Sequence, residues 1–399
     1  MALRFLCILS CAALICAADE AGAAPPPGGI YAIIEASAAD QYPVARKALS
    51  NPGIDGLLIH LRWKQISPRL KMRYDWTMLD RAVQLAVKAN KRFEIGIVTG
   101  AALPGWITAP PPQGLGALSA TFDVQPLGGK CTSFTMAAPW DQAYLKAFRD
   151  LLHQLAAHLH KTGAYNRLAM LKLFGITTTT DELRVPALAE CGVDAVQTWL
   201  SIGYTQANME TGWKAMLQDY LDYFPKISFN IGFIGFNAFP GIAADGTVAK
   251  TRKQAETISA QFAAVLYDDA GAAMPAHIAL GFDSLVLKNP PADKSYPHSK
   301  REFFADIASA NARPGWQTNE LLGNYPGGGA ACEGSSPDDA VACTSTGEFR
   351  RMLMRGVFPK GPENTPPDMQ GVYLEVFPRN VVAFPRALPP VHASLAPWN

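Results

Sequence analysis

Eight short apolar runs alternate along the chain with stretches whose apolar residues recur at helical spacing. The runs read as buried strands, and the intervening stretches, such as 75–89 and 141–160, predict amphipathic helices. The strands are predicted at 29–36, 53–63, 92–100, 168–176, 227–235, 277–287, 315–322 and 371–377. Eight strands that alternate with helices predict an α/β fold, and the count is typical of a (β/α)8 TIM barrel.

The lengths of the predicted connections support a barrel. Connections from a helix to the next strand are short, as at 51–52, 90–91 and 313–314, whereas connections after the third, fourth, sixth and seventh strands are long. This asymmetry is expected where the working face lies at the C-terminal ends of the strands. The main alternative is a doubly wound open sheet, which usually binds a nucleotide through a Gly-rich first turn. The residues after the first strand, 35–38, do not form such a turn.

Composition narrows the class of protein. Of the 399 residues, 49% are hydrophobic and 17% are charged, so a large core can form and disorder is not expected. The formal net charge of +1 gives no reason to expect binding to nucleic acid or to an anionic membrane surface. With no internal repeat, residues 25–399 are predicted to be one barrel domain, ending in an irregular Pro-rich tail at 378–399.

The N-terminus has the pattern of a secretory signal peptide. Arg4 is followed by an apolar run from Phe5 to Ala18 and then by the small residues 21–24. We therefore predict that residues 1–24 are a signal and that the protein is secreted or periplasmic. The alternative is a membrane anchor, but the run is short for a transmembrane helix. No other stretch is long enough, so stable membrane insertion is not expected.

The cysteines predict two disulfides. Three of the seven lie in the predicted signal, which leaves Cys131, Cys191, Cys332 and Cys343. An even number in an exported chain favours disulfide pairing. Cys332 and Cys343 lie in one Gly/Ser/Pro/Asp-rich stretch and are predicted to pair, which leaves Cys131 with Cys191. A metal site is the alternative, but no CxxC or HExxH spacing supports it, so no metal is predicted.

The fourth predicted strand has an unusual exit. It leads through four threonines, 177–180, into Asp181, Glu182, Leu183 and Arg184. Barrel enzymes keep catalytic carboxylates at the C-terminal ends of their strands, so Glu182 is predicted to be a catalytic acid. The alternative is a carboxylate at a helix N-terminus, where the helix dipole would favour it.

Further polar and aromatic residues are predicted to converge on the same edge of the barrel. Amides and carboxylates bind hydroxyl groups, and aromatic faces stack on the apolar faces of pyranose rings, so this mixture suits a sugar. The alternatives are a structural ion pair for the arginine and core positions for the tryptophans. His60, within the second strand, is predicted to be a core histidine with satisfied hydrogen bonds. The residues predicted to bind substrate are Arg62, Trp63, Trp106, Asp181 and Asn319.

Glycoside hydrolysis requires a second carboxyl group across the scissile bond. Glu320 at the seventh strand and Glu375 on the eighth are the candidates. Because Glu375 alternates with Leu374 and Val376, it points either into the barrel mouth or to an arginine. A separation of roughly 5–5.5 Å between the two carboxyl groups gives retention and a wider one gives inversion, and the sequence leaves both open.

Several short motifs resemble known glycosidases. Arg62-Trp63 followed by residues 74–76, 79–80 and 104–107 resembles the first part of clan A glycoside hydrolases, barrel enzymes that include family-42 β-galactosidases, cellulases and xylanases. This resemblance implies an acid/base at the fourth strand and a nucleophile at the seventh, which correspond to Glu182 and Glu320. The segment 181–186 is similar to the acid-bearing segment of β-amylases, inverting barrel enzymes whose base lies in a Leu-Glu context similar to 374–375.

Together these features predict an exported glycosidase that cleaves O-glycosidic bonds of a poly- or oligosaccharide and requires no cofactor. Glu182 would be the acid/base, and Glu320 or Glu375 the nucleophile or base. The alternative from another class is a carbohydrate-binding barrel that has lost catalysis. The sequence contains no GxSxG, P-loop or HExxH motif, so none of these motifs indicates a different chemistry. The sequence does not indicate which sugar or linkage is cleaved, whether cleavage is endo or exo, or what the oligomeric state is.

Overall fold

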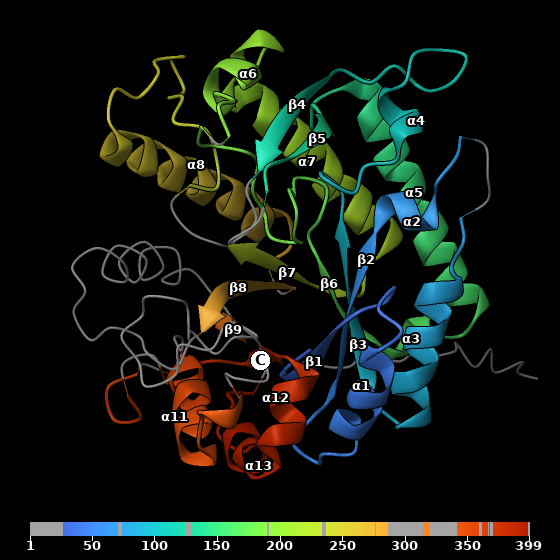
Figure 1. The fold of residues 1–399 in the computed structure, drawn as a ribbon, viewed down its shortest axis with the longest axis vertical. Coiled ribbons are helices and arrows are strands. Elements are labelled where there is room, and N and C mark those ends of the chain that lie inside the picture. The colour runs from blue at the N-terminus through green and yellow to red at the C-terminus, as the bar shows by residue number, and fades with distance from the viewer. Residues whose placement is uncertain are drawn as a thin grey trace, which may run out of the picture.

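The computed structural model describes most of the chain after the predicted signal. The described residues are 27–70, 74–124, 130–189, 191–233, 237–275, 277–285, 314–318, 341–358, 361–365, 367 and 370–397. Within them, eight parallel strands form a closed barrel with helices around it, which confirms the predicted (β/α)8 fold (Figure 1).

Each barrel strand lies at a position that the apolar runs predicted. Each strand pairs with the next in chain order, and β10 closes the barrel by pairing with β1 from Gly29–Tyr373 to Ala32–Val376. The strands are β1 (Gly29–Glu35), β2 (Gly56–Arg62), β3 (Arg92–Val98), β6 (Leu168–Lys172), β7 (Ser228–Phe233), β8 (Ile278–Leu285), β9 (Pro314–Thr318) and β10 (Tyr373–Val376).

The helices contribute buried apolar residues to a core that they share with the barrel strands. Several begin at side-chain caps: Asp141 accepts hydrogen bonds from the Ala143 and Tyr144 amides, and Ser345 and Glu348 form a reciprocal capping box. The helices are α1 (Gln41–Leu49), α2 (Trp63–Ile66), α3 (Thr77–Lys88), α4 (Gly105–Thr108), α5 (Gln142–Lys161), α6 (Ala195–Ser201), α7 (Gln206–Tyr223), α8 (Arg252–Ala273), α11 (Thr346–Val357), α12 (Pro378–Ala383) and α13 (Leu388–His392), with 3-10 turns η1 (Tyr165–Arg167) and η3 (Pro385–Ala387).

The long loop after the third barrel strand contains a hairpin that the sequence pattern did not predict. Antiparallel strands β4 (Ser119–Val124) and β5 (Thr132–Ala137) lie beside α6 (Figure 1). Phe122 packs its ring 4.7 Å from that of Trp199 on α6. The predicted disulfide Cys131–Cys191 is confirmed and joins the start of β5 to the loop that precedes α6. Cys343 is also disulfide-bonded, and its predicted partner Cys332 lies outside the described residues.

The prediction of an irregular C-terminal tail is wrong, because α12, η3 and α13 pack onto the barrel beside α1 and α11 (Figure 1). Prolines stand in the first turns of all three helices, where a missing backbone N–H breaks no helical hydrogen bond. Val381, Leu388 and Val391 are fully buried, and the Asn51 side-chain amide donates to the Pro385 carbonyl at 2.9 Å.

The predicted signal peptide at 1–24 lies outside the described residues and remains a prediction. Across the described ranges, no helix has both the length and the apolar character needed to cross a membrane.

We expect Leu388→Ala to lower the free energy of unfolding by about 2–5 kcal/mol, because it leaves a cavity under α13. The matched control is Leu118→Ala, since Leu118 is 41% exposed and should tolerate the same truncation with little change. Urea unfolding followed by circular dichroism measures both. Equal losses in the two variants would show that the tail does not belong to the core.

Candidate active site

A lysine inside the barrel joins two carboxylates. Lys172, the last residue of β6, has a side chain that is only 2% exposed. Its Nζ lies 2.8 Å from Glu375 Oε2 on β10 and 3.1 Å from Asp181 Oδ2 on the loop after β6. A buried ammonium is tolerated only where opposite charges compensate for its lost hydration, and these two carboxylates provide them.

Glu375 is held from three directions. Besides the Lys172 contact, its Oε1 accepts a hydrogen bond from Asn230 Nδ2 at 3.0 Å, and its Oε2 accepts one from Gln317 Nε2 at 2.9 Å. The side chain therefore points into the barrel, one of the two orientations expected from the strand alternation. The alternative was an ion pair with an arginine, but the cation that Glu375 contacts is Lys172.

A chain of alternating charges runs from Asp181 to the rim of the barrel. His60 Nε2 lies 3.0 Å from Asp181 Oδ2, and His60 Nδ1 lies 3.4 Å from Glu35 Oε1. Arg62 Nε completes the chain 3.6 Å from Glu35 Oε2, with an arginine side chain that is 39% exposed. His60 thus lies between two carboxylates as a charge partner, although its Nε2 meets no hydrogen-bond geometry among the described residues, and Arg62 forms the ion pair considered as its alternative role.

The charges in this chain stabilise one another. Burial alone would lower the pKa of His60, but the Asp181 carboxylate outweighs it and raises that pKa to about 10. Burial raises the pKa of Asp181, yet His60 and Lys172 outweigh it and hold that pKa well below its usual range. At neutral pH the pair is therefore an imidazolium beside a carboxylate.

Glu94 on β3 differs from the other buried acids. It is completely buried, and neither carboxyl oxygen has a hydrogen-bond partner among the described residues. Burial first, and the nearby Glu375 second, raise its pKa well above the ordinary value. Burial thus favours the neutral form of Glu94 next to the Lys172 network.

The four threonines fix the exit of the fourth barrel strand. Thr177 Oγ1 accepts a hydrogen bond from the Thr99 amide at 2.9 Å and lies 2.9 Å from Thr99 Oγ1. Arg184 Nη2 donates to the hydroxyls of Thr179 at 3.2 Å and Thr180 at 3.0 Å. The hydroxyls tie the loop to the end of β3 and to its own arginine, which explains polar residues in a segment that is largely buried.

Asp181 and Glu182 enter the barrel mouth on opposite sides of β6. A Cβ at Gly96, on the inner face of β3, would lie 2.5 Å from Asp181 Oδ2. A Cβ at Gly232, two residues beyond the inward-facing Asn230 of β7, would lie 3.4 Å from Glu182 Cγ. The two glycines leave the space that these side chains occupy.

Glu182 does not stand at a helix N-terminus, which was its alternative role, because α6 begins only at Ala195. The adjacent Leu183 amide donates to the Gly232 carbonyl at 2.9 Å and holds the segment against β7. The Glu182 side chain is 3% exposed, and its buried Oε2 has no hydrogen-bond partner within the described ranges. That oxygen is therefore not committed to a protein donor among the described residues.

The other predicted substrate contacts have different outcomes. Trp63 is fully buried, with its ring 6.0 Å from Tyr144 and 6.4 Å from Phe148, so the prediction that it stacks on a sugar is wrong. It begins α2, which turns the indole into the core. Trp106 is half-buried and donates its indole N–H to the Ser67 carbonyl at 2.9 Å.

Asp181 is committed to ion pairs rather than open to a ligand. Asn319 and Glu320 lie outside the described residues.

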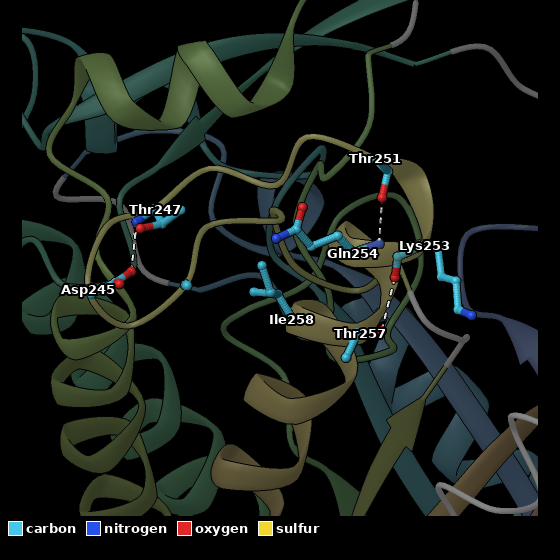
Figure 2. A pocket seen from close by; sticks show the side chains of 8 residues that line it. Asp245, Thr247, Thr251, Lys253, Gln254, Thr257 and Ile258 are labelled. Carbon is cyan, nitrogen blue, oxygen red and sulfur yellow. Dashed lines mark hydrogen bonds between the residues drawn. The ribbon is translucent and has the colours of Figure 1, made fainter.

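A separate hollow lies at the start of α8, with a volume of about 610 Å³ (Figure 2). Several polar groups around it are hydrogen-bonded to one another. The Gln254 backbone N–H donates to Thr251 Oγ1, and the Thr257 hydroxyl donates to the Lys253 backbone carbonyl. The Thr247 backbone N–H donates to Asp245 Oδ1. Among the described residues that line the hollow, Asp245 is the one carboxylate, so they do not provide the pair that glycoside hydrolysis needs. In the ranges described, no group of three or more His, Cys, Asp or Glu is placed to hold a metal ion.

Solved structures share this fold. The catalytic domain of a β-amylase from Paenibacillus polymyxa superposes with a TM-score of 0.55 and 11% identity, over 92% of this chain and 100% of that one. A GH10 endoxylanase from a sugarcane soil metagenome covers 88% of this chain and 86% of its own, with a TM-score of 0.48 and 10% identity. No protein-family model matches the sequence, and no curated protein matches it. At 11% identity, the likeness to the β-amylase domain establishes the barrel fold alone.

The sequence reading overlooked Lys172 and Glu94. Lys172 is the one charged residue in the apolar run LAMLK, and Glu94 is the one charged residue in the apolar run FEIGIV. A charge in a strand that is apolar on both sides points into a parallel barrel, because a buried charge needs partners on other strands. That signal was present and predicts an internal polar network.

We expect Gly96→Ala to destabilise the fold by about 1–3 kcal/mol, since the new Cβ would displace Asp181 from its cations. Gly105→Ala is the control, because a Cβ there meets nothing within 4 Å. Differential scanning calorimetry compares the two. Similar melting temperatures would mean that the barrel mouth accommodates the methyl group without moving Asp181.

The His60–Asp181 pair makes stability depend on pH. Because the pKa of His60 is raised in the folded state, its contribution is complete below about pH 6.5 and is lost as the pH rises towards about 10. We expect His60→Gln to be less stable than wild type by about 3 kcal/mol at pH 6, with the difference shrinking towards pH 10. Chemical denaturation at several pH values measures it, with the exposed His153→Gln as control. A gap independent of pH would contradict the assignment.

Proposed function

We propose that this protein is a glycoside hydrolase that cleaves O-glycosidic bonds of an oligo- or polysaccharide, with Glu182 as the general acid. The observation that carries the proposal is the position of Glu182, which lies on the loop after the fourth barrel strand and reaches into the barrel mouth. The shared fold with a protein described as a β-amylase supports this assignment. We also propose that residues 1–24 direct export.

Glu182 has the position that a proton donor requires. Its carboxyl group is enclosed, and one of its oxygens has no hydrogen-bond partner among the described residues, so binding a glycosidic oxygen there would displace no protein donor from that oxygen. Protonation of the leaving oxygen makes cleavage of the C–O bond easier as the oxocarbenium-like transition state forms.

The geometry argues against Glu375 as the second carboxylate. Glu375 bonds to Asn230, whereas Glu182 lies against Gly232, one inward-facing position nearer the mouth and roughly 6.6 Å farther along β7. Both carboxyl groups are buried, but the oxygens of Glu375 accept hydrogen bonds from Lys172, Asn230 and Gln317. A sugar cannot reach it without breaking those bonds, so we assign Glu375 to the internal network and the nucleophile or base to Glu320.

Residues at the rim would bind the sugar. Arg62 presents an exposed guanidinium beside Glu35, and Trp106 presents a half-buried indole after β3. With Asn319, they supply hydrogen-bond donors and an aromatic face to the ring next to the scissile bond. No step of this reaction requires a cofactor.

A carbohydrate-binding barrel without catalysis is the second candidate. The observation that favours it is the commitment of Glu375 to three donors, since it leaves Glu182 without a free partner carboxylate among the described inward-facing residues at the mouth. The two candidates differ in product release rather than in ligand class.

Reducing-end release from a panel of glycans tests the proposal. We expect wild type to release product and Glu182→Gln to lose about 10²–10⁴-fold in kcat with an unchanged melting temperature. Glu320→Gln should be comparably impaired, and the exposed Glu363→Gln should match wild type. Failure of wild type to hydrolyse any glycan, together with calorimetric binding of one, would favour the binding barrel.

A further inference from the structure

We propose that Asp181 is a positioning residue for the acid: by binding Lys172 and His60 inside the barrel, it fixes the direction in which Glu182 enters the mouth. The inference deepens the proposed function and rests on it. We assign Asp181 no substrate contact, because its carboxylate is turned towards β3 and its Oδ2 lies in the ion pairs with Lys172 and His60.

Two cations on separate strands hold the Asp181 carboxylate. His60 belongs to β2 and Lys172 to β6, and both lie within 3.1 Å of Oδ2. Contacts from two strands restrain the position of this oxygen more than a single contact would, while Oδ1 has no hydrogen-bond partner among the described residues. The space for it exists because Gly96 has no side chain.

The anchor transmits to Glu182 because the two residues are adjacent. Asp181 lies over β3, whereas Glu182 lies over β7, so the backbone between them crosses above β6. The backbone of this crossing is tied at Leu183, which bonds to Gly232, and at Thr178, which accepts from the Ala101 amide at 2.8 Å. Asp181 fixes the middle of the crossing, where the acid is attached.

An ionised anchor is required by its surroundings. An asparagine in place of Asp181 would keep the shape of the side chain and could keep an acceptor oxygen at the position of Oδ2, but it would carry no charge. The imidazolium and the ammonium would then lose the negative charge that compensates them. The loop would turn the substituted side chain away from the barrel and carry Glu182 with it.

A misplaced general acid has a kinetic signature that a weakened fold lacks. In an aryl glycoside, a good leaving group such as 2,4-dinitrophenolate departs without protonation. A poor leaving group such as phenolate departs efficiently only if the general acid protonates its oxygen. The ratio of kcat/KM for the dinitrophenyl and phenyl glycosides therefore measures proton donation, because kcat/KM reports the steps through the first irreversible bond cleavage. A uniform loss of folded enzyme leaves this ratio unchanged.

The experiment measures both kcat/KM values for wild type and variants, using aryl glycosides of whichever sugar the wild type hydrolyses. We expect Glu182→Gln to lose about 10³-fold on the phenyl substrate and less than about tenfold on the dinitrophenyl one. Asp181→Asn should show the same pattern, with at least roughly a tenfold difference between substrates. The control is Asp219→Asn, a buried aspartate paired with Arg149 between the outer helices, which should lose equally on both.

Two further measurements keep the inference testable if Asp181→Asn folds poorly. Gly96→Ala pushes on the same carboxylate without changing its charge and should show a smaller version of the leaving-group pattern. NMR titration of the His60 imidazole needs no substrate: the pKa of about 10 should fall in Asp181→Asn. An unchanged His60 pKa would overturn the anchor.

Failure of the proposed function and failure of the anchor give different results. A wild type that cleaves no glycoside overturns the proposed function, and the catalytic part of this inference falls with it. A wild type that is active, with the expected pattern in Glu182→Gln but an equal loss on both substrates in Asp181→Asn, overturns the positioning role alone.

Discussion

One buried ammonium group determines how the mouth of this barrel is built. Lys172 Nζ lies between Asp181 and Glu375, so it connects the loop after the fourth strand to the eighth strand. With His60 protonated, the interior pairs two cations with these two carboxylates, while burial favours the neutral form of Glu94. Removing any one member would leave a charge without compensation, a defect that typically costs about 3–5 kcal/mol.

The charges fit inside the barrel because glycines face them. Gly96 stands opposite Asp181, Gly232 opposite Glu182, and Gly281 opposite the side chains of Asn230 and Tyr373. Each position would place a Cβ within 2.5–3.4 Å of its neighbour. The inner face therefore alternates large polar groups with empty positions, which is how a closed barrel of eight strands accommodates side chains of unequal size.

Much of the fold could be predicted from the sequence, because eight apolar runs alternate with amphipathic segments and a parallel barrel strand is apolar on both faces. The site was less predictable. The exit at Glu182 stood out by its composition, but the direction of a side chain depends on what the next strand leaves open, as Gly232 does. Trp63 failed as a prediction because a helix begins at that residue and turns the indole inward. Lys172 was overlooked because a single charged residue barely changes the mean hydropathy of an apolar run.

The Lys172–Glu375 contact also has a consequence for the order of folding. Its two residues are 203 positions apart in the chain, and the second lies on the strand that closes the barrel onto β1. During synthesis, Lys172 and Asp181 are complete long before Glu375, Gln317 and β10 exist. A partly made chain would have to bury an ammonium with only part of its compensation, so the half-barrel gains little by compacting early. The buried charge of Lys172 thus delays stable closure of the barrel until the last strand has been made.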